Sequence, residues 1–210
     1  MDPSDSRISP TDLVQLLDEH HVVVLADDPR QRRQFTRVLS DHLNAQPQTE
    51  VVVLDGANMT DLPSLVRELT RRAGRDDPVD LPPDGEGERG VPAPDPFEAV
   101  IDLLRQWPGT PHHRYLLWRE ADVLLDADLA LFARFVNALF AVAAEREHLN
   151  AEPLILQRVA LIGNAKLGAY AEDERGQFSC WLEDEEGGSP FWEVMSCVDR
   201  PPVITCRLDD

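Results

Sequence analysis

Charged and polar residues follow three apolar segments of this sequence, and their types could serve phosphate chemistry. Residues 26–33 carry arginines after the run Val-Val-Val-Leu, and residues 119–122 hold two carboxylates after Tyr-Leu-Leu-Trp. Asn164 comes shortly after a third apolar run, Val-Ala-Leu-Ile at 159–162. Arginine can neutralise phosphate, a carboxylate can hold Mg²⁺ or polarise water, and an amide can contact a terminal phosphate. A nucleotide site is therefore the first chemistry to test against these residues.

The first group lies where a strand turns into a helix, which is where nucleotide-binding proteins carry a phosphate loop. Aligned with the pattern G-x-x-x-x-G-K-[ST], this segment has neither glycine, and arginine replaces the lysine. Glycines let backbone N–H groups turn toward an anion, so Ala26 and Gln31 make that geometry costly. Asp27 and Asp28 add negative charge where a triphosphate would lie. The degenerate phosphate-loop position comprises Ala26, Asp27, Asp28, Pro29, Arg30, Gln31, Arg32 and Arg33.

Residues 115–122 resemble the Walker B element of AAA+-type and related P-loop ATPases, in which apolar residues precede Asp-Glu-Ala-Asp. This chain keeps Glu-Ala-Asp at 120–122 but has Arg119 where the magnesium-linked aspartate belongs. Asn164 is similar to the sensor-1 residue, which in this family contacts the γ-phosphate and the attacking water. The resemblance therefore implies that residues 119–122 and Asn164 belong to the same nucleotide site as the phosphate-loop position at 26–33.

The resemblance spans nearly the whole chain, from the first strand to the fifth, and also rests on the order and spacing of the elements. It implies a P-loop NTPase-like core. The family's small helical lid domain, with its sensor-2 arginine, has no room after Arg207. The resemblance therefore implies neither full AAA+ membership nor a hexameric ring.

Residues needed for nucleotide hydrolysis are missing at separate parts of the site, which predicts that this chain does not hydrolyse nucleotides. The phosphate loop lacks its glycines and lysine, and Arg119 removes a carboxylate that would help to hold Mg²⁺. We therefore expect an inactive P-loop NTPase-like domain without a cofactor, which acts as a regulatory or scaffold protein through protein contacts. A protein partner is expected, and a homo-oligomer is possible. A further hypothesis is that Arg119 fills the site by pairing with Asp27, Asp28 or Glu120.

Two alternatives stay open at this stage. A divergent ATPase or nucleotide-binding switch would bind Mg-ATP, with Arg32 replacing lysine, Glu120 polarising water and Asn164 sensing the γ-phosphate. A small-molecule binding protein would use the same crevice at the strand ends for another ligand. Two segments are candidate partner surfaces, namely the broadly apolar helix at 128–148 and the acidic, aromatic-containing stretch at 172–186. Packing in the core is the alternative interpretation of both segments.

The spacing of apolar residues predicts strands that alternate with helices, and hence a three-layer α/β fold with an open, mainly parallel sheet. Strands are expected at 22–25, 50–56, 114–119, 157–162 and 202–207, and helices at about 10–20, 31–43, 61–74, 97–107, 128–148 and 191–194. The length suits a single domain over residues 1–210. Residues 75–96 hold six prolines, three glycines and seven acidic residues, so they are expected to form a flexible insert.

The composition narrows the possible partners. A formal net charge of −19, from 39 acidic and 20 basic residues, repels phosphate backbones and argues against nucleic-acid binding. No apolar run is long enough to cross a membrane, and residues 1–7 lack the features of a signal peptide. Neither the histidine pairs at 20–21 and 112–113 nor the three cysteines have metal-ligand spacing, so no metal site is expected. An odd number of cysteines without C-x-x-C spacing fits a reducing compartment, which predicts a cytoplasmic protein.

Overall fold

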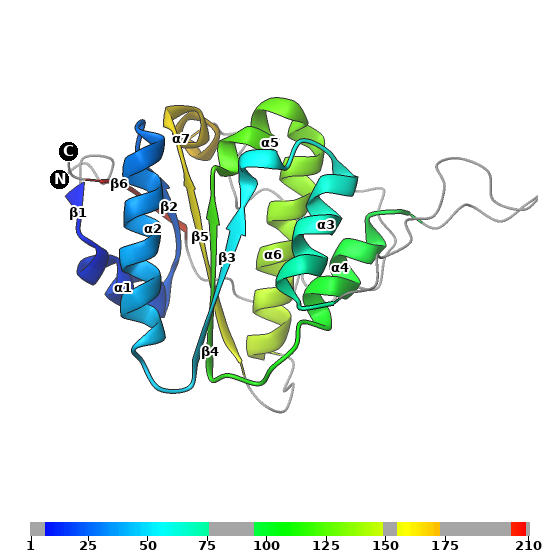
Figure 1. Cartoon of the computed structure of the whole chain (residues 1–210), viewed down its shortest axis with the longest axis horizontal. Coiled ribbons are helices and arrows are strands. Elements are labelled where there is room, and N and C mark those ends of the chain that lie inside the picture. The colour runs from blue at the N-terminus through cyan, green and yellow to red at the C-terminus, as the bar shows by residue number, and fades with distance from the viewer. Residues whose placement is uncertain (1–6, 76–94, 149–154, 173–202, 209–210) are drawn as a thin grey trace, which may run out of the picture.

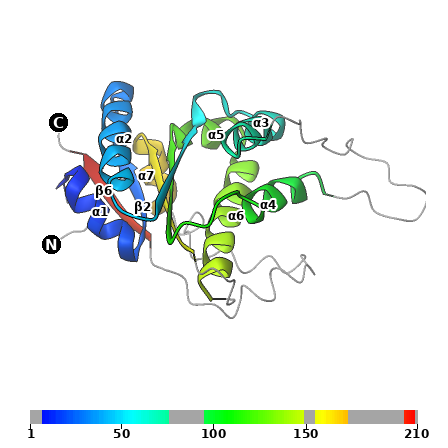
Figure 2. The same ribbon diagram turned by 60° about the horizontal axis from the view of Figure 1, so that its bottom comes forward.

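The strands of this computed structural model form one parallel sheet with helices on both faces (Figures 1 and 2). The structure describes residues 7–75, 95–148, 155–172 and 203–208. In these ranges the strand order is β1-β6-β2-β5-β4-β3, and every neighbouring pair is parallel. The strands are β1 (Arg7–Ile8), β2 (His21–Leu25), β3 (Thr49–Asp55), β4 (His113–Arg119), β5 (Leu156–Gly163) and β6 (Val203–Leu208). The predicted three-layer α/β architecture is therefore confirmed.

The helices divide between the two faces of the sheet. They are α1 (Pro10–Glu19), α2 (Pro29–Asn44), α3 (Leu62–Arg72), α4 (Glu98–Arg105), α5 (Ala121–Ala127), α6 (Leu129–His148) and α7 (Ala165–Glu172), with a short 3₁₀ turn at Gly56–Asn58. Leucines of α1 and α2 pack with Val22 and Val24 on one face. The other helices pack with Val23 and Leu25 on the opposite face. Successive residues of β2 point to opposite faces, so the uninterrupted apolar run from Val22 to Leu25 suits this central position.

Helix α6 is part of the core, so of its two interpretations core packing is right and the partner surface is wrong. Phe132 and Phe135 are fully buried, and their ring centroids lie 5.5 and 4.9 Å from that of Trp118 on β4. The helix packs on β5 as well as against α4 and α5, so its apolar residues face several neighbours. Leu129, at its first turn, is 56% exposed and is the one large apolar residue of the described chain that is exposed.

Several element boundaries differ from the sequence predictions. Strand β1 and helices α5 and α7 were not predicted, since each is short and the two helices follow polar strand ends. Helix α2 begins at Pro29 rather than near Gln31, because Asp28 caps it and proline suits the first helical position. Most of the predicted insert (76–94), the acidic stretch after residue 172 and the helix at 191–194 lie outside the described residues.

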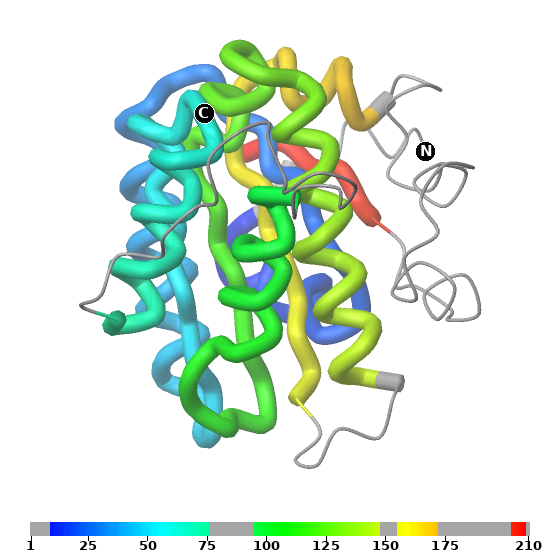
Figure 3. The backbone as a smooth tube through the Cα atoms, turned by 90° about the vertical axis from the view of Figure 1, so that its right-hand side faces the viewer, coloured from blue at the N-terminus to red at the C-terminus, as the bar shows by residue number. Residues whose placement is uncertain are grey.

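The sheet topology predicts that a ligand crevice would lie at the carboxyl ends of the central strands. Strand β2 leads into α2 on one face, whereas its neighbour β5 leads into α7 on the other. Ligands of open parallel sheets bind where such neighbouring connections diverge. This end of the sheet lies at the top of Figure 3, where α5 and α7 begin. No helix among the described residues is both long and apolar enough to cross a membrane.

Candidate functional site

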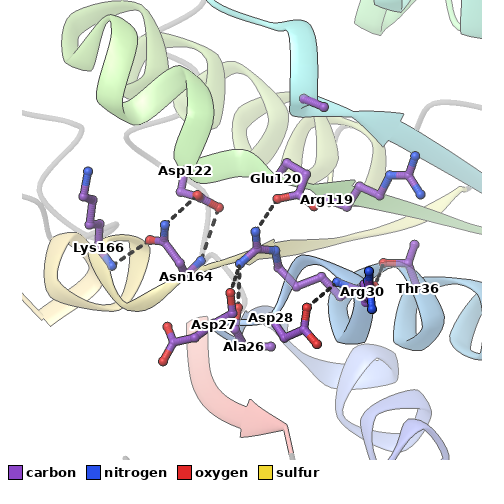
Figure 4. Close-up of polar contacts among 12 residues, drawn as sticks. Ala26, Asp27, Asp28, Arg30, Thr36, Arg119, Glu120, Asp122, Asn164 and Lys166 are labelled. Carbon is purple, nitrogen blue, oxygen red and sulfur yellow. Dashed lines mark hydrogen bonds and ion pairs between the residues drawn. The ribbon is translucent and has the colours of Figure 1, made fainter.

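Arg32 occupies the centre of the crevice. It projects from the first turn of α2, and its side chain is 5% exposed. One terminal nitrogen, Nη2, donates to Glu120 Oε2 at 2.5 Å. The other, Nη1, donates to the carbonyl oxygens of Ala26 at 2.6 Å and Asp27 at 3.3 Å (Figure 4). A single guanidinium therefore joins the ends of β2 and β4.

Glu120 is directed toward Arg32 by the backbone at the end of β4. Its φ of 55° and ψ of 37° are left-handed, a conformation that is uncommon for a residue with a side chain. Its Oε1 and the Nε of Arg32 are buried and have no hydrogen-bond partner among the described residues. The carboxylate and the guanidinium are thus each other's main charged contact in a site from which water is largely excluded.

The connection between β2 and α2 consists only of Ala26, Asp27 and Asp28. Asp28 caps α2, because its carboxylate accepts a hydrogen bond from the backbone N–H of Arg30 at 2.8 Å. The backbone N–H of Ala26 donates to the carbonyl oxygen of Gly163 at 2.9 Å, which ties the connection to β5. The rest of the aligned phosphate-loop position is the first turn of α2, comprising Pro29, Arg30, Gln31, Arg32 and Arg33.

Asp122 and Asn164 form a second polar pair next to Arg32 (Figure 4). Asn164 donates to the Asp122 carboxylate from its side-chain amide at 2.8 Å and from its backbone N–H at 3.2 Å. Asp122 is 5% exposed, and its burial raises the pKa of the carboxyl group above its usual value. The Walker B-like and sensor-1-like residues are therefore neighbours, as the resemblance implied, but they bind each other.

Arg119 does not enter the crevice, so the hypothesis about its partner was wrong. Its guanidinium extends away from Glu120 in Figure 4 and binds the carboxylate of Asp55, with Nη2 to Oδ2 at 2.7 Å. The two residues lie directly opposite each other on β4 and β3. Hydrogen bonding from Arg119 lowers the pKa of Asp55 below its usual value. The ion pair that closes the crevice is made by Arg32 instead.

Glu68 of α3 is a residue that the sequence analysis missed. Its carboxylate accepts the backbone N–H of Asp55 at 3.0 Å and also binds Arg71 and Arg72. Burial raises the pKa of Glu68, but the two arginines outweigh it, and the pKa is lowered overall. A carboxylate followed at the third and fourth positions by arginines is a sequence signal for such a helical ion-pair cluster.

Metal-ligating residues do not gather in the part of the chain that the structure describes. No group of three or more histidine, cysteine or carboxylate residues there could hold a metal ion. His21 belongs to the core, because its Nδ1 accepts the N–H of Val159 at 3.1 Å and its ring stacks 4.3 Å from Phe140. Burial raises the pKa of the Cys206 thiol to about 12, so that cysteine stays protonated and inert at neutral pH.

Comparison with known proteins finds a likeness in three dimensions only. Neither a family model nor a curated protein matches the sequence. Among solved structures, the chain resembles the ORC2 protein of Aeropyrum pernix, solved as ADPNP-ADP complexes, with a TM-score of 0.52 and 10% identity. The alignment covers 94% of this chain and 46% of ORC2. The fold is P-loop NTPase-like.

Two further solved structures are similar at lower TM-scores. One is the ORC1 protein of Aeropyrum pernix in complex with DNA, at 0.49 and 13% identity over 79% of this chain and 41% of that chain. The other is Cdc6p of Pyrobaculum aerophilum, at 0.46 and 14% identity over 93% and 43%. This chain thus spans less than half of the length of each of the three proteins.

Proposed function

We propose that this chain is an inactive P-loop NTPase-like domain that binds no nucleotide and acts as a regulatory or scaffold protein. The observation that carries the proposal is the buried Arg32–Glu120 ion pair, at 2.5 Å. Its arginine stands at the lysine position of the phosphate-loop pattern and its glutamate follows the Walker B-like strand. The cation that would bind phosphate thus neutralises the carboxylate that would polarise water.

The cost of separating Arg32 from Glu120 supports a closed site. Leaving one partner of a buried ion pair without the other costs about 3–5 kcal/mol. Arg32 would also give up its hydrogen bonds to the carbonyl oxygens of Ala26 and Asp27. A nucleotide would have to offset these losses before it gained any net affinity.

The amino end of α2 gives the proposal a second line of support. A phosphate bound at a helix end uses backbone N–H groups and the positive end of the helix dipole. Here Pro29 has no N–H, and the carboxylate of Asp28 accepts the N–H of Arg30. An incoming phosphate would meet the negative charge of Asp28 at that point. The residues present therefore fit a triphosphate and its Mg²⁺ poorly.

The experiment is a thermal-unfolding titration with Mg-ATP, Mg-GTP and their diphosphates up to millimolar concentration. A ligand that binds only the native state, at a free concentration 100 times its Kd, would raise the free energy of unfolding by about 2.7 kcal/mol. We expect no shift in Tm, whereas an active P-loop ATPase in the same plate should shift. A saturable increase in Tm with any of the nucleotides would overturn the proposal in favour of a divergent nucleotide-binding switch.

A further inference from the structure

We infer that the outer edge of β3 and the adjacent arginine-lined groove form a docking site for an extended acidic peptide. This inference rests on the proposed scaffold role, to which it adds a surface and a class of partner. It uses residues outside the Arg32–Glu120 ion pair. Its test is run without nucleotide, so its failure would leave the result of the nucleotide titration unchanged.

The open strand edge is the first part of the site. Strand β3 ends the sheet, and among the described residues β4 is its only strand neighbour. It lies at the front of Figure 1, between α2 and α3. An edge strand presents backbone donors and acceptors that can pair with an added strand. Seven residues, Thr49–Asp55, give this edge enough length for such pairing.

Glu68 occupies one end of that edge. Its contact there shows which backbone groups can pair with an added strand. Its carboxylate accepts the N–H of Asp55. Peptide groups of alternate residues in a strand point to the same edge, so those of Val51 and Val53 share the outward direction of the Asp55 N–H. An added strand would therefore pair along Thr49–Val53 and stop where Glu68 already occupies the edge.

The groove beside this edge supplies positive charge. It measures about 600 Å³ and lies between α2 and β3, and its lining residues are Arg33, Gln34, Thr36, Arg37, Ser40, Asp41, Val53 and Arg119. Arg33 and Arg37 are exposed, and neither has an ion-pair partner within the described part of the chain. Asp41 is the one carboxylate in the lining. The groove is thus cationic on a chain whose net charge is −19.

These two parts select the chemistry of the partner. Val51 and Val53 face the side of the sheet that α2 covers. Alternate side chains of a strand added beside them would point to the same side, toward Arg33 and Arg37. Carboxylates at those alternate positions would neutralise the two arginines, as charge complementarity at interfaces requires.

A second copy of this chain and a nucleic acid are the competing occupants. Edge-to-edge pairing of two β3 strands would bring the arginine rows of both α2 helices toward each other, which costs energy through like-charge repulsion. A nucleic acid could bind the arginines, but it has no backbone groups to pair with a strand edge.

The experiment measures fluorescence anisotropy of a labelled peptide of alternating Glu and Val residues, with a Lys-Val peptide and an oligothymidine as competitors of other chemistry. We expect saturable binding of the Glu-Val peptide alone. The double variant Arg33→Glu/Arg37→Glu should weaken it at least about tenfold, since two attractions become repulsions. Arg75→Glu, which makes the same charge change after α3 on the opposite face of the sheet from α2, should alter affinity by less than about twofold.

Hydrogen exchange of β3 supplies an independent readout of strand addition. Bound peptide should slow exchange of the Val51 and Val53 amides, and Val53→Pro, which deletes an edge N–H, should abolish that binding while the protein still unfolds cooperatively. Four results would overturn the inference. These are no saturable binding of the Glu-Val peptide, equal effects of the double and Arg75→Glu variants, tighter binding of the oligothymidine, and a dimer that buries β3.

Discussion

Arg32 and Glu120 are 88 positions apart in the chain, yet Nη2 of one lies 2.5 Å from Oε2 of the other. The arginine comes from the first turn after β2 and the glutamate from the first residue after β4. Strand β5 lies between those two strands, so the ion pair spans the carboxyl end of the sheet. The pair links the centre of the sheet to its β3 side and fills the space between the strand ends.

Arg32→Ala should destabilise the fold by about 3–5 kcal/mol, because it leaves the buried carboxylate of Glu120 without its cation. Guanidinium-induced unfolding followed by circular dichroism would measure the change. Arg33→Ala is the matched control, since Arg33 is the next residue of α2 and is exposed. Its effect should stay within about 0.5 kcal/mol.

Replacing both Arg32 and Glu120 should lower the free energy of unfolding far less than replacing only one of them. In Arg32→Met/Glu120→Leu, apolar side chains of similar size remove both charges, and such exchanges of buried pairs are often neutral or stabilising. We expect the double variant to unfold within about 1.5 kcal/mol of the wild type. If its loss equalled the sum of the two single losses, the ion pair would have no special role.

Restoring the lysine should not restore a nucleotide site. Arg32→Lys supplies the lysine of the phosphate-loop pattern, but the short connection and the Asp28 cap remain. Lysine also lacks the planar fork that reaches Glu120 and the two carbonyl oxygens together. We expect no Mg-ATP-dependent rise in Tm and a lower Tm without ligand. A saturable rise in this variant would show that only the lysine was missing.

The Arg119–Asp55 pair should contribute little to the free energy of unfolding, and only at pH values above the acid range. Both side chains are partly exposed, at 25% and 30%, so Arg119→Ala should cost less than about 1 kcal/mol at neutral pH. The pKa of Asp55 is lowered in the fold, so its stabilisation is present above the unfolded value near 3.8 and is lost as pH falls below it. The free energy of unfolding at pH 7 and pH 3 would test this.

Asp41→Asn is the control for that comparison. Asp41 is exposed on α2 and has no ion pair with any described residue. The difference between wild type and Asp55→Asn should shrink from pH 7 to pH 3. The difference for Asp41→Asn should change less. Equal changes in the two variants would contradict a specific contribution from Arg119.

Asp122 should show the opposite pH dependence. Burial raises its pKa in the folded state, so protonation favours folding, and its contribution weakens as pH rises through the raised value. The advantage of wild type over Asp122→Asn should therefore be larger at pH 4 than at pH 7. Denaturation at both values would check this. A larger advantage at pH 7 would mean that the hydrogen bonds from Asn164 outweigh burial.

The sequence predicted the layers of the fold because its strands and long helices carry clear apolar patterns. Residues 22–25 have no polar member, and helix α6 has apolar residues around most of its circumference. The short helices α5 and α7 carry weaker patterns and directly follow the polar strand ends. They were therefore missed, although they lie beside the candidate site.

The ion pairs of the site could not be assigned from the sequence, because they depend on the strand order. Asp55 and Arg119 each end a predicted strand, but only the adjacency of β3 and β4 makes them partners. The choice of Glu120 as partner for Arg32 depends in turn on the left-handed backbone at Glu120. Hydrophobic periodicity carries no information about that conformation.

The strand order also has a consequence for synthesis of the chain. Strand β2 is made before both of its neighbours, because β5 and β6 come from residues 156–163 and 203–208. Both edges of this strand, which is apolar from Val22 to Leu25, stay unpaired until those later residues have been translated. Contacts between such distant segments form slowly, and unpaired apolar edges invite association with other chains. The nascent protein should therefore depend on protection by chaperones until β6 has closed the sheet.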